Sequence, residues 1–68
     1  MVQYEINVEG NILTIRVQDN STHVIIDGSN IIGQIYPVIY ETGIVWETKD
    51  LSATFAKKIT KALELHYT

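Results

Sequence analysis

The sequence predicts an α+β fold, an antiparallel β-meander of four to five strands with one C-terminal amphipathic helix packed on one face of the sheet in two layers. Two observations predict this fold. Turn-forming residues divide residues 2–48 into short segments in which apolar and polar residues alternate or β-branched residues cluster. From Leu51 the apolar residues recur at spacings of three and four, which is typical of a helix. The 68 residues have room for a single domain, 1–68.

Composition excludes several classes of protein. The chain has no cysteine, so neither a disulfide scaffold nor a Cys-based zinc site can form. Its uninterrupted apolar runs are far too short to cross a membrane, and it opens on a strand-like pattern without the features of a secretory signal. We therefore expect a cytoplasmic protein with no membrane partner. A domain this short has a marginal core, which oligomerisation can supplement.

The first hairpin has the clearest pattern in the chain. We expect residues 2–9 to pair with residues 12–17 around a two-residue turn at Gly10-Asn11. This register places apolar pairs on one face and polar pairs on the other: Val8–Leu13, Ile6–Ile15 and Tyr4–Val17, against Glu5–Arg16 and Asn7–Thr14. A slip by one residue would mix the two faces.

Turn-forming residues bound three further predicted strands. The turns and strands follow in the order turn 19–22, strand 23–27, turn at Gly28-Ser29 or Asp27-Gly28, strand 31–41, turn 42–43 and strand 44–48. Gly33 and Pro37 interrupt the long strand, and Pro37 marks a bulge, a bend or an outward-facing edge position because proline cannot donate to a ladder. Strand orders other than the sequential one stay open.

The C-terminal segment changes to a helical period. Asp50 is the predicted N-cap. The apolar stripe consists of Leu51, Phe55, Ile59, Ala62, Leu63 and His66, and the opposite side carries Ala53, Lys57, Lys61 and Glu64. One face of this helix therefore needs a partner, which the sheet supplies.

The later strands carry more apolar side chains than one helix can cover. Continuing the alternation through the turns predicts one set under the helix: Val24, Ile26, Ile31, Ile35, Ile39, Ile44 and Trp46. The opposite face would then expose a contiguous patch of Ile25, Ile32, Tyr36, Val38, Tyr40 and Val45. Exposed patches of this kind usually mark an interaction surface. The alternative is that a bulge at Pro37 or a curled sheet covers the patch within the chain itself.

This patch leads to the functional expectation. We expect a non-catalytic interaction or assembly module that binds through the tyrosine-containing face, either as a homodimer or as an accessory subunit that docks on a larger protein. A two-fold dimer is the commonest closed symmetry. Tyrosine suits such a surface because its ring is apolar while its hydroxyl can stay hydrated.

Catalytic and metal-binding patterns are weak, so we expect no enzyme, no metal and no cofactor. The four glycines sit where turns or bulges need them, and Ser21 and Thr22 precede His23 without a triad pattern. We interpret His23 as a surface residue and His66 as a residue that interacts with the helix dipole. Glu41 and Glu47 face opposite ways in the predicted last hairpin and form no acid–base pair.

An uneven charge distribution supports one alternative function. Residues 1–48 contain Arg16 as their only cation, whereas residues 49–68 contain four lysines. Lys57, Lys58 and Lys61 could contact phosphates in a nucleic-acid-binding accessory protein. Against this alternative, the net charge is −3, and neither an arginine nor an aromatic residue lies among these lysines.

Overall fold

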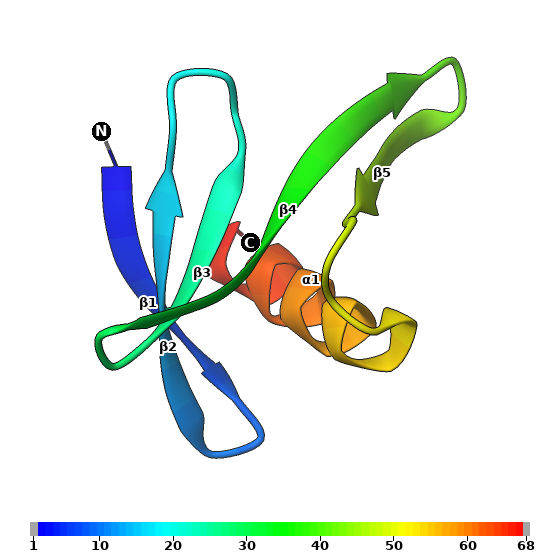
Figure 1. The fold of residues 1–68 in the computed structure, drawn as a ribbon. Helices are drawn as coiled ribbons and strands as arrows, with labels where there is room; N and C mark the ends of the chain where they lie inside the picture. The colour runs from blue at the N-terminus through cyan, green and yellow to red at the C-terminus, as the bar shows by residue number, and fades with distance from the viewer. Residues whose placement is uncertain (1, 68) are drawn as a thin grey trace.

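The predicted fold class is confirmed. The structure is a computed structural model that describes residues 2–67, and in it a five-stranded antiparallel meander curls around one C-terminal helix (Figure 1). The strands follow one another in the order β1-β2-β3-β4-β5. The elements are β1 (Val2–Val8), β2 (Asn11–Val17), β3 (His23–Asp27), β4 (Asn30–Tyr40), β5 (Gly43–Glu47) and α1 (Ala53–Tyr67).

The first hairpin keeps its predicted faces but turns one residue earlier than predicted. Glu9 and Gly10 form the turn, both with positive φ (52° and 89°), as a type I′ turn requires. The Asn7 Oδ1 atom accepts a hydrogen bond from the Gly10 N–H at 2.8 Å and supports this turn. The pairs are therefore Ile6–Leu13 and Tyr4–Ile15 rather than those predicted, and Arg16 lies opposite Gln3, not Glu5.

The loop between β2 and β3 reverses the predicted faces of β3. The prediction assumed a four-residue turn, whereas the connection covers five residues, 18–22, in which the Gln18 N–H bonds the Thr22 carbonyl. A loop with an odd number of residues places odd-numbered residues of one strand opposite odd-numbered residues of the next. Ile25 therefore lies opposite Ile15, on the face that packs against the helix. Val24 and Ile26, predicted under the helix, instead lie on the other face, although both are buried.

A β-bulge between β3 and β4 reverses the faces a second time. Ile26 pairs with Ile31, but Ile25 pairs with Gly33, so Ile32 is an extra residue in β4. Ile32 packs against the core instead of lying in an exposed patch. Because two reversals cancel, Ile35 returns to the helix face, as predicted, and is fully buried.

The core lies between the curled sheet and α1. Its buried members come from β1 to β4 and from the helix: Ile6, Val8, Leu13, Ile15, Ile25, Ile35, Ile59 and Leu63. The predicted helix stripe is confirmed at Leu51, Phe55, Ile59, Ala62 and Leu63, all of which belong to this core or pack against it. The sixth member, His66, is exposed and stacks on the Tyr4 ring, with the centroids 4.2 Å apart.

The helix begins later than predicted, and its N-cap is Ser52 rather than Asp50. The Ser52 hydroxyl accepts a hydrogen bond from the Phe55 N–H at 3.2 Å, which satisfies one of the free donors of the first turn. Asp50 has a different role, because its Oδ1 atom accepts a hydrogen bond from the Gln34 N–H of β4. Asp50 therefore ties the connection before the helix to the sheet.

The last hairpin projects beyond the core. β4 pairs with β3 as far as Ile35 and with β5 from Tyr36 onward, so residues 36–47 form a two-stranded extension, here called the β4–β5 arm (Figure 1). Its turn consists of Glu41 and Thr42, one residue earlier than predicted, which leaves the faces unchanged. Among residues 2–67, no helix is long and apolar enough to cross a bilayer.

Candidate functional site

Four of the six residues predicted to bind a partner share one face of the β4–β5 arm. Tyr36 and Val38 are half-buried, whereas Tyr40 and Val45 are 50% and 48% exposed. Val38 and Val45 face each other across the two strands. Of the other two predicted residues, Ile25 is fully buried in the core, and Ile32 is half-buried and packs against the core from β4.

The opposite face of the arm is also apolar and exposed. Ile39 and Ile44 form a cross-strand pair and are 80% and 62% exposed. The prediction placed both under the helix, which is wrong because the arm continues past the part of the sheet that α1 covers (Figure 1). The sequence did contain a signal, since residues 38–40 and 44–46 are apolar without alternation. Strands of that kind are typically covered on both faces.

The base of the arm is anchored by Trp46. Its ring packs against the core and meets the His23 ring edge-on, with centroids 4.8 Å apart and planes at 81°. His23 is buried rather than at the surface as predicted, and its Nδ1 atom lies 2.8 Å from the Ser21 carbonyl oxygen. The odd loop before β3 turns His23 to the helix face, which explains the difference.

The connection from β5 to α1 is attached to β4 at Gly33 and Gln34, just before the arm begins. The Thr48 hydroxyl lies 2.8 Å from the Gln34 carbonyl oxygen, to which it donates, and 3.1 Å from Asp50 Oδ1. The Leu51 side chain lies directly over Gly33, where a Cβ atom would come within 2.7 Å of the Leu51 Cγ atom. A larger residue at this position would therefore force the Leu51 side chain to move.

An open groove runs between the base of the arm and the helix. Its volume is about 470 Å³, and it is lined by Trp46, Glu47, Thr48, Ala53, Ala56, Lys57 and Thr60. The helix contributes mainly small side chains at Ala53, Ala56 and Thr60, so the floor of the groove lies close to the helix backbone. A second hollow of about 290 Å³ lies between β1 and the end of the helix.

One polar interaction crosses the arm. The Tyr40 hydroxyl donates a hydrogen bond to Glu47 Oε2 at 3.0 Å. This hydrogen bond and the negative charge of Glu47 raise the pKa of the Tyr40 phenol above its ordinary value, with a further contribution from desolvation. Glu41 lies in the turn of the arm, whereas Glu47 pairs with Tyr36 at the opposite end.

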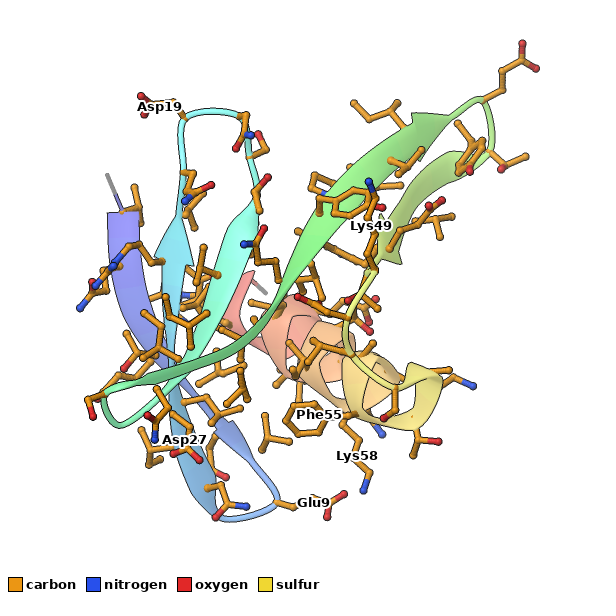
Figure 2. All side chains as sticks on the ribbon, in the orientation of Figure 1. Glu9, Asp19, Asp27, Lys49, Phe55 and Lys58 are labelled. Carbon is orange, nitrogen blue, oxygen red and sulfur yellow. The ribbon has the colours of Figure 1, made fainter. Side chains whose placement is uncertain are left out.

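The three lysines of the alternative prediction differ in their surroundings. Lys57 and Lys61 are exposed and lie four residues apart on the helix, which places them on one side. Lys58 instead forms an ion pair with Glu9 in the β1–β2 turn, at 2.7 Å between Nζ and Oε1 (Figure 2). One of the three cations is thus partly neutralised within the chain.

The described part of the chain brings no three metal-ligating side chains (His, Cys, Asp or Glu) together. Comparison with models of protein families, with curated proteins and with solved structures finds no match to this chain. The candidate site is therefore defined by its geometry, a two-stranded arm with apolar side chains exposed on both faces and a groove at its base.

Proposed function

We propose that this protein is a non-catalytic assembly module that self-associates through the β4–β5 arm. The observation that supports the proposal is the exposed Ile39–Ile44 pair on one face of a hairpin whose other face exposes Tyr40 and Val45. Large apolar side chains exposed together on a monomer usually mark an interaction surface.

The arm has little support of its own. A two-stranded hairpin is marginally stable in water, and this one extends past the core that supports the rest of the sheet. A partner would therefore stabilise the arm in two ways. It would bury the apolar side chains, and it would hold the two strands of the hairpin together.

The gain from burial is of the size that association requires. Burying one large aliphatic side chain contributes about 1.5–3 kcal/mol, and association costs roughly 4–15 kcal/mol in lost freedom and ordering. Each copy can offer four partly exposed side chains, Ile39, Tyr40, Ile44 and Val45. Burial of two of these side chains from each copy, four in all, already gives an amount of the same order as that cost.

Charge favours an interface at this place. Between residues 36 and 46 the sequence contains one charged residue, Glu41, which lies in the turn. The centres of protein interfaces are poor in charged residues and rich in aromatic ones. The arm has that composition, with Tyr36, Tyr40 and Trp46 in a segment of eleven residues.

Sedimentation equilibrium tests the proposal with a matched pair of double variants. In the first, Ile39→Lys is combined with Ile44→Lys in the arm. In the second, Ile12→Lys is combined with Ile31→Lys, since these isoleucines are exposed to a similar degree (53% and 64%) outside the arm. Both variants add the same charge.

We expect the wild type and the Ile12/Ile31 variant to sediment as dimers or larger assemblies, and the Ile39/Ile44 variant as a monomer with an unchanged helical circular-dichroism signal. A wild type that stays monomeric at high micromolar concentration contradicts the proposal. Equal dissociation of both variants also contradicts it, because the effect would then come from charge alone.

A further inference from the structure

We infer that two copies join edge to edge along β5, antiparallel and centred on Val45, so that Ile44 of each copy enters the groove between Trp46 and α1 of the other. This inference rests on the proposed self-association and specifies its geometry. It commits to a second copy of this chain as the occupant of both the strand edge and the groove.

The outer edge of β5 has hydrogen-bonding groups available for such pairing. In an antiparallel pair, hydrogen-bonded and non-hydrogen-bonded rungs alternate. Pro37 lies opposite Trp46 and has no N–H, so this rung is a non-hydrogen-bonded one. Val45 therefore bonds inward to Val38, and the backbone groups of Ile44 and Trp46 point to the open edge of the sheet.

Symmetry restricts the register of two β5 strands. A two-fold axis perpendicular to the sheet keeps each side chain on its own face. Residues that lie opposite each other must also share a face, so both must be odd-numbered or both even-numbered. The axis therefore lies at a residue that is opposite itself in the second copy. Centred on Val45, it pairs all five residues of Gly43–Glu47. Centred on Ile44 or Trp46, it would pair only residues 43–45 or 45–47.

The Val45-centred register also places compatible side chains together. Ile44 lies opposite Trp46 of the second copy, and Gly43 lies opposite its Glu47, so no like charges meet. Lys49 lies at the base of the arm (Figure 2). In this register the turn with Glu41 of one copy comes next to Lys49 of the other copy. Opposite charges therefore meet at both ends of the interface.

The groove at the base of the arm can receive Ile44 of the second copy, which this register places next to it. Ile44 and Trp46 share the helix face of β5, because they are two residues apart in a strand. Ile44 of the second copy thus lies beside Trp46 at the mouth of the 470 Å³ groove, above the small side chains Ala53, Ala56 and Thr60. A side chain that is 62% exposed in one copy is covered there.

Single cysteine variants test this geometry, since the chain has no cysteine of its own. Val45→Cys places two thiols directly opposite each other, with Cα atoms about 4.5 Å apart in a non-hydrogen-bonded rung. This distance lies within the range of roughly 4.4–6.8 Å that disulfides span. Val38→Cys is the matched control, because it shares a rung and a face with Val45 but lies on β4. Its thiols would be three strand spacings apart, about 14 Å.

We expect mild oxidation to convert Val45→Cys almost completely into a covalent dimer and to leave Val38→Cys unlinked, with both reduced variants dimeric by sedimentation. If the wild type is dimeric but Val45→Cys does not cross-link, or Val38→Cys cross-links equally, edge pairing is wrong while self-association stands. A monomeric wild type contradicts both proposals.

The fluorescence of Trp46, the single tryptophan, tests the groove separately. Dissociation of the dimer on dilution should shift the Trp46 emission to longer wavelength, because Ile44 of the second copy leaves the groove and water enters. An emission that does not change while the dimer dissociates shows that the groove lies outside the interface and contradicts that part of the inference.

Discussion

The Leu51 side chain covers Gly33 so closely that a methyl group at Gly33 would lie within 2.7 Å of the Leu51 Cγ atom. This contact presses the connection before α1 onto β4, next to the bulge at Ile32. Together with the hydrogen bonds that Thr48 and Asp50 make with Gln34, it joins the connection before the helix to β4 near the base of the β4–β5 arm.

Gly33→Ala should destabilise the protein by about 1–3 kcal/mol, the usual effect of overpacking a tight contact. The φ angle of Gly33 is not in the left-handed region, so the effect arises from the contact with Leu51. Urea denaturation measures the free energy of unfolding. In a Leu51→Ala background the same substitution should cost much less, and an equal cost in both backgrounds would show that Leu51 is not the cause.

Glu9→Asn should stabilise the first hairpin by a fraction of the roughly 1–2 kcal/mol that the left-handed conformation costs an ordinary residue. Glu9 has φ 52° in a type I′ turn, where asparagine is strongly preferred, while its exposed ion pair with Lys58 contributes only about 0.2–1 kcal/mol. Salt weakens the ion pair but not the turn preference. The advantage of the variant in thermal or urea unfolding should therefore grow with salt concentration, and an advantage that shrinks with salt would contradict this account.

Glu47→Gln should lower the pKa of the Tyr40 phenol toward its ordinary value, because the hydrogen bond and the charge of Glu47 raise it. A group that binds its proton more tightly in the folded protein contributes stability fully below its unfolded pKa and loses it as the pH rises through the folded pKa. The wild type should lose this contribution at alkaline pH.

NMR titration of the Tyr40 ring carbons measures this pKa, with Tyr40→Phe to assign the signal. A Tyr40 pKa that is the same in the wild type and in Glu47→Gln would show that Glu47 does not raise it.

Tyr40→Glu should yield a monomer. Tyr40 lies beside Gly43, which the Val45-centred register places opposite Glu47 of the second copy, so the variant brings two carboxylates toward each other across the interface. Tyr40→Phe should remain a dimer, since it keeps the ring and loses only the hydroxyl. Sedimentation equilibrium measures both variants, and circular dichroism checks that the helix is retained. Identical assembly of the glutamate variant and the wild type would place Tyr40 outside the interface.

Much of the fold follows from local patterns. The alternation in residues 2–8 assigns both faces of the first hairpin correctly, even though the turn moved to Glu9 and Gly10, because the register changed by two positions. The helical spacing from Leu51 to Leu63 identifies the buried side of α1 because it depends only on the 3.6-residue period. Both patterns lie within one element or one hairpin.

The faces of the later strands could not be derived in the same way. One additional loop residue before β3 moved Ile25 into the core, and the bulge at Ile32 reversed the alternation again. Neither the length of this loop nor the position of the bulge is marked by a repeating pattern of apolar residues in the sequence. Each depends on how a neighbouring strand or the Leu51 connection packs, and a single residue is enough to exchange the two faces.

The sequence by itself determined that the later strands carry more apolar side chains than one helix can cover, and it placed Tyr36, Val38, Tyr40 and Val45 on one face. Only the tertiary structure decided that Ile25 belongs to the core, that Ile32 packs against it, and that Ile39 and Ile44 lie exposed. There are two physical reasons. The loop before β3 and the bulge at Ile32 reverse the faces of the strands without leaving a periodic signal, and burial on a given face depends on how far the helix extends across the sheet.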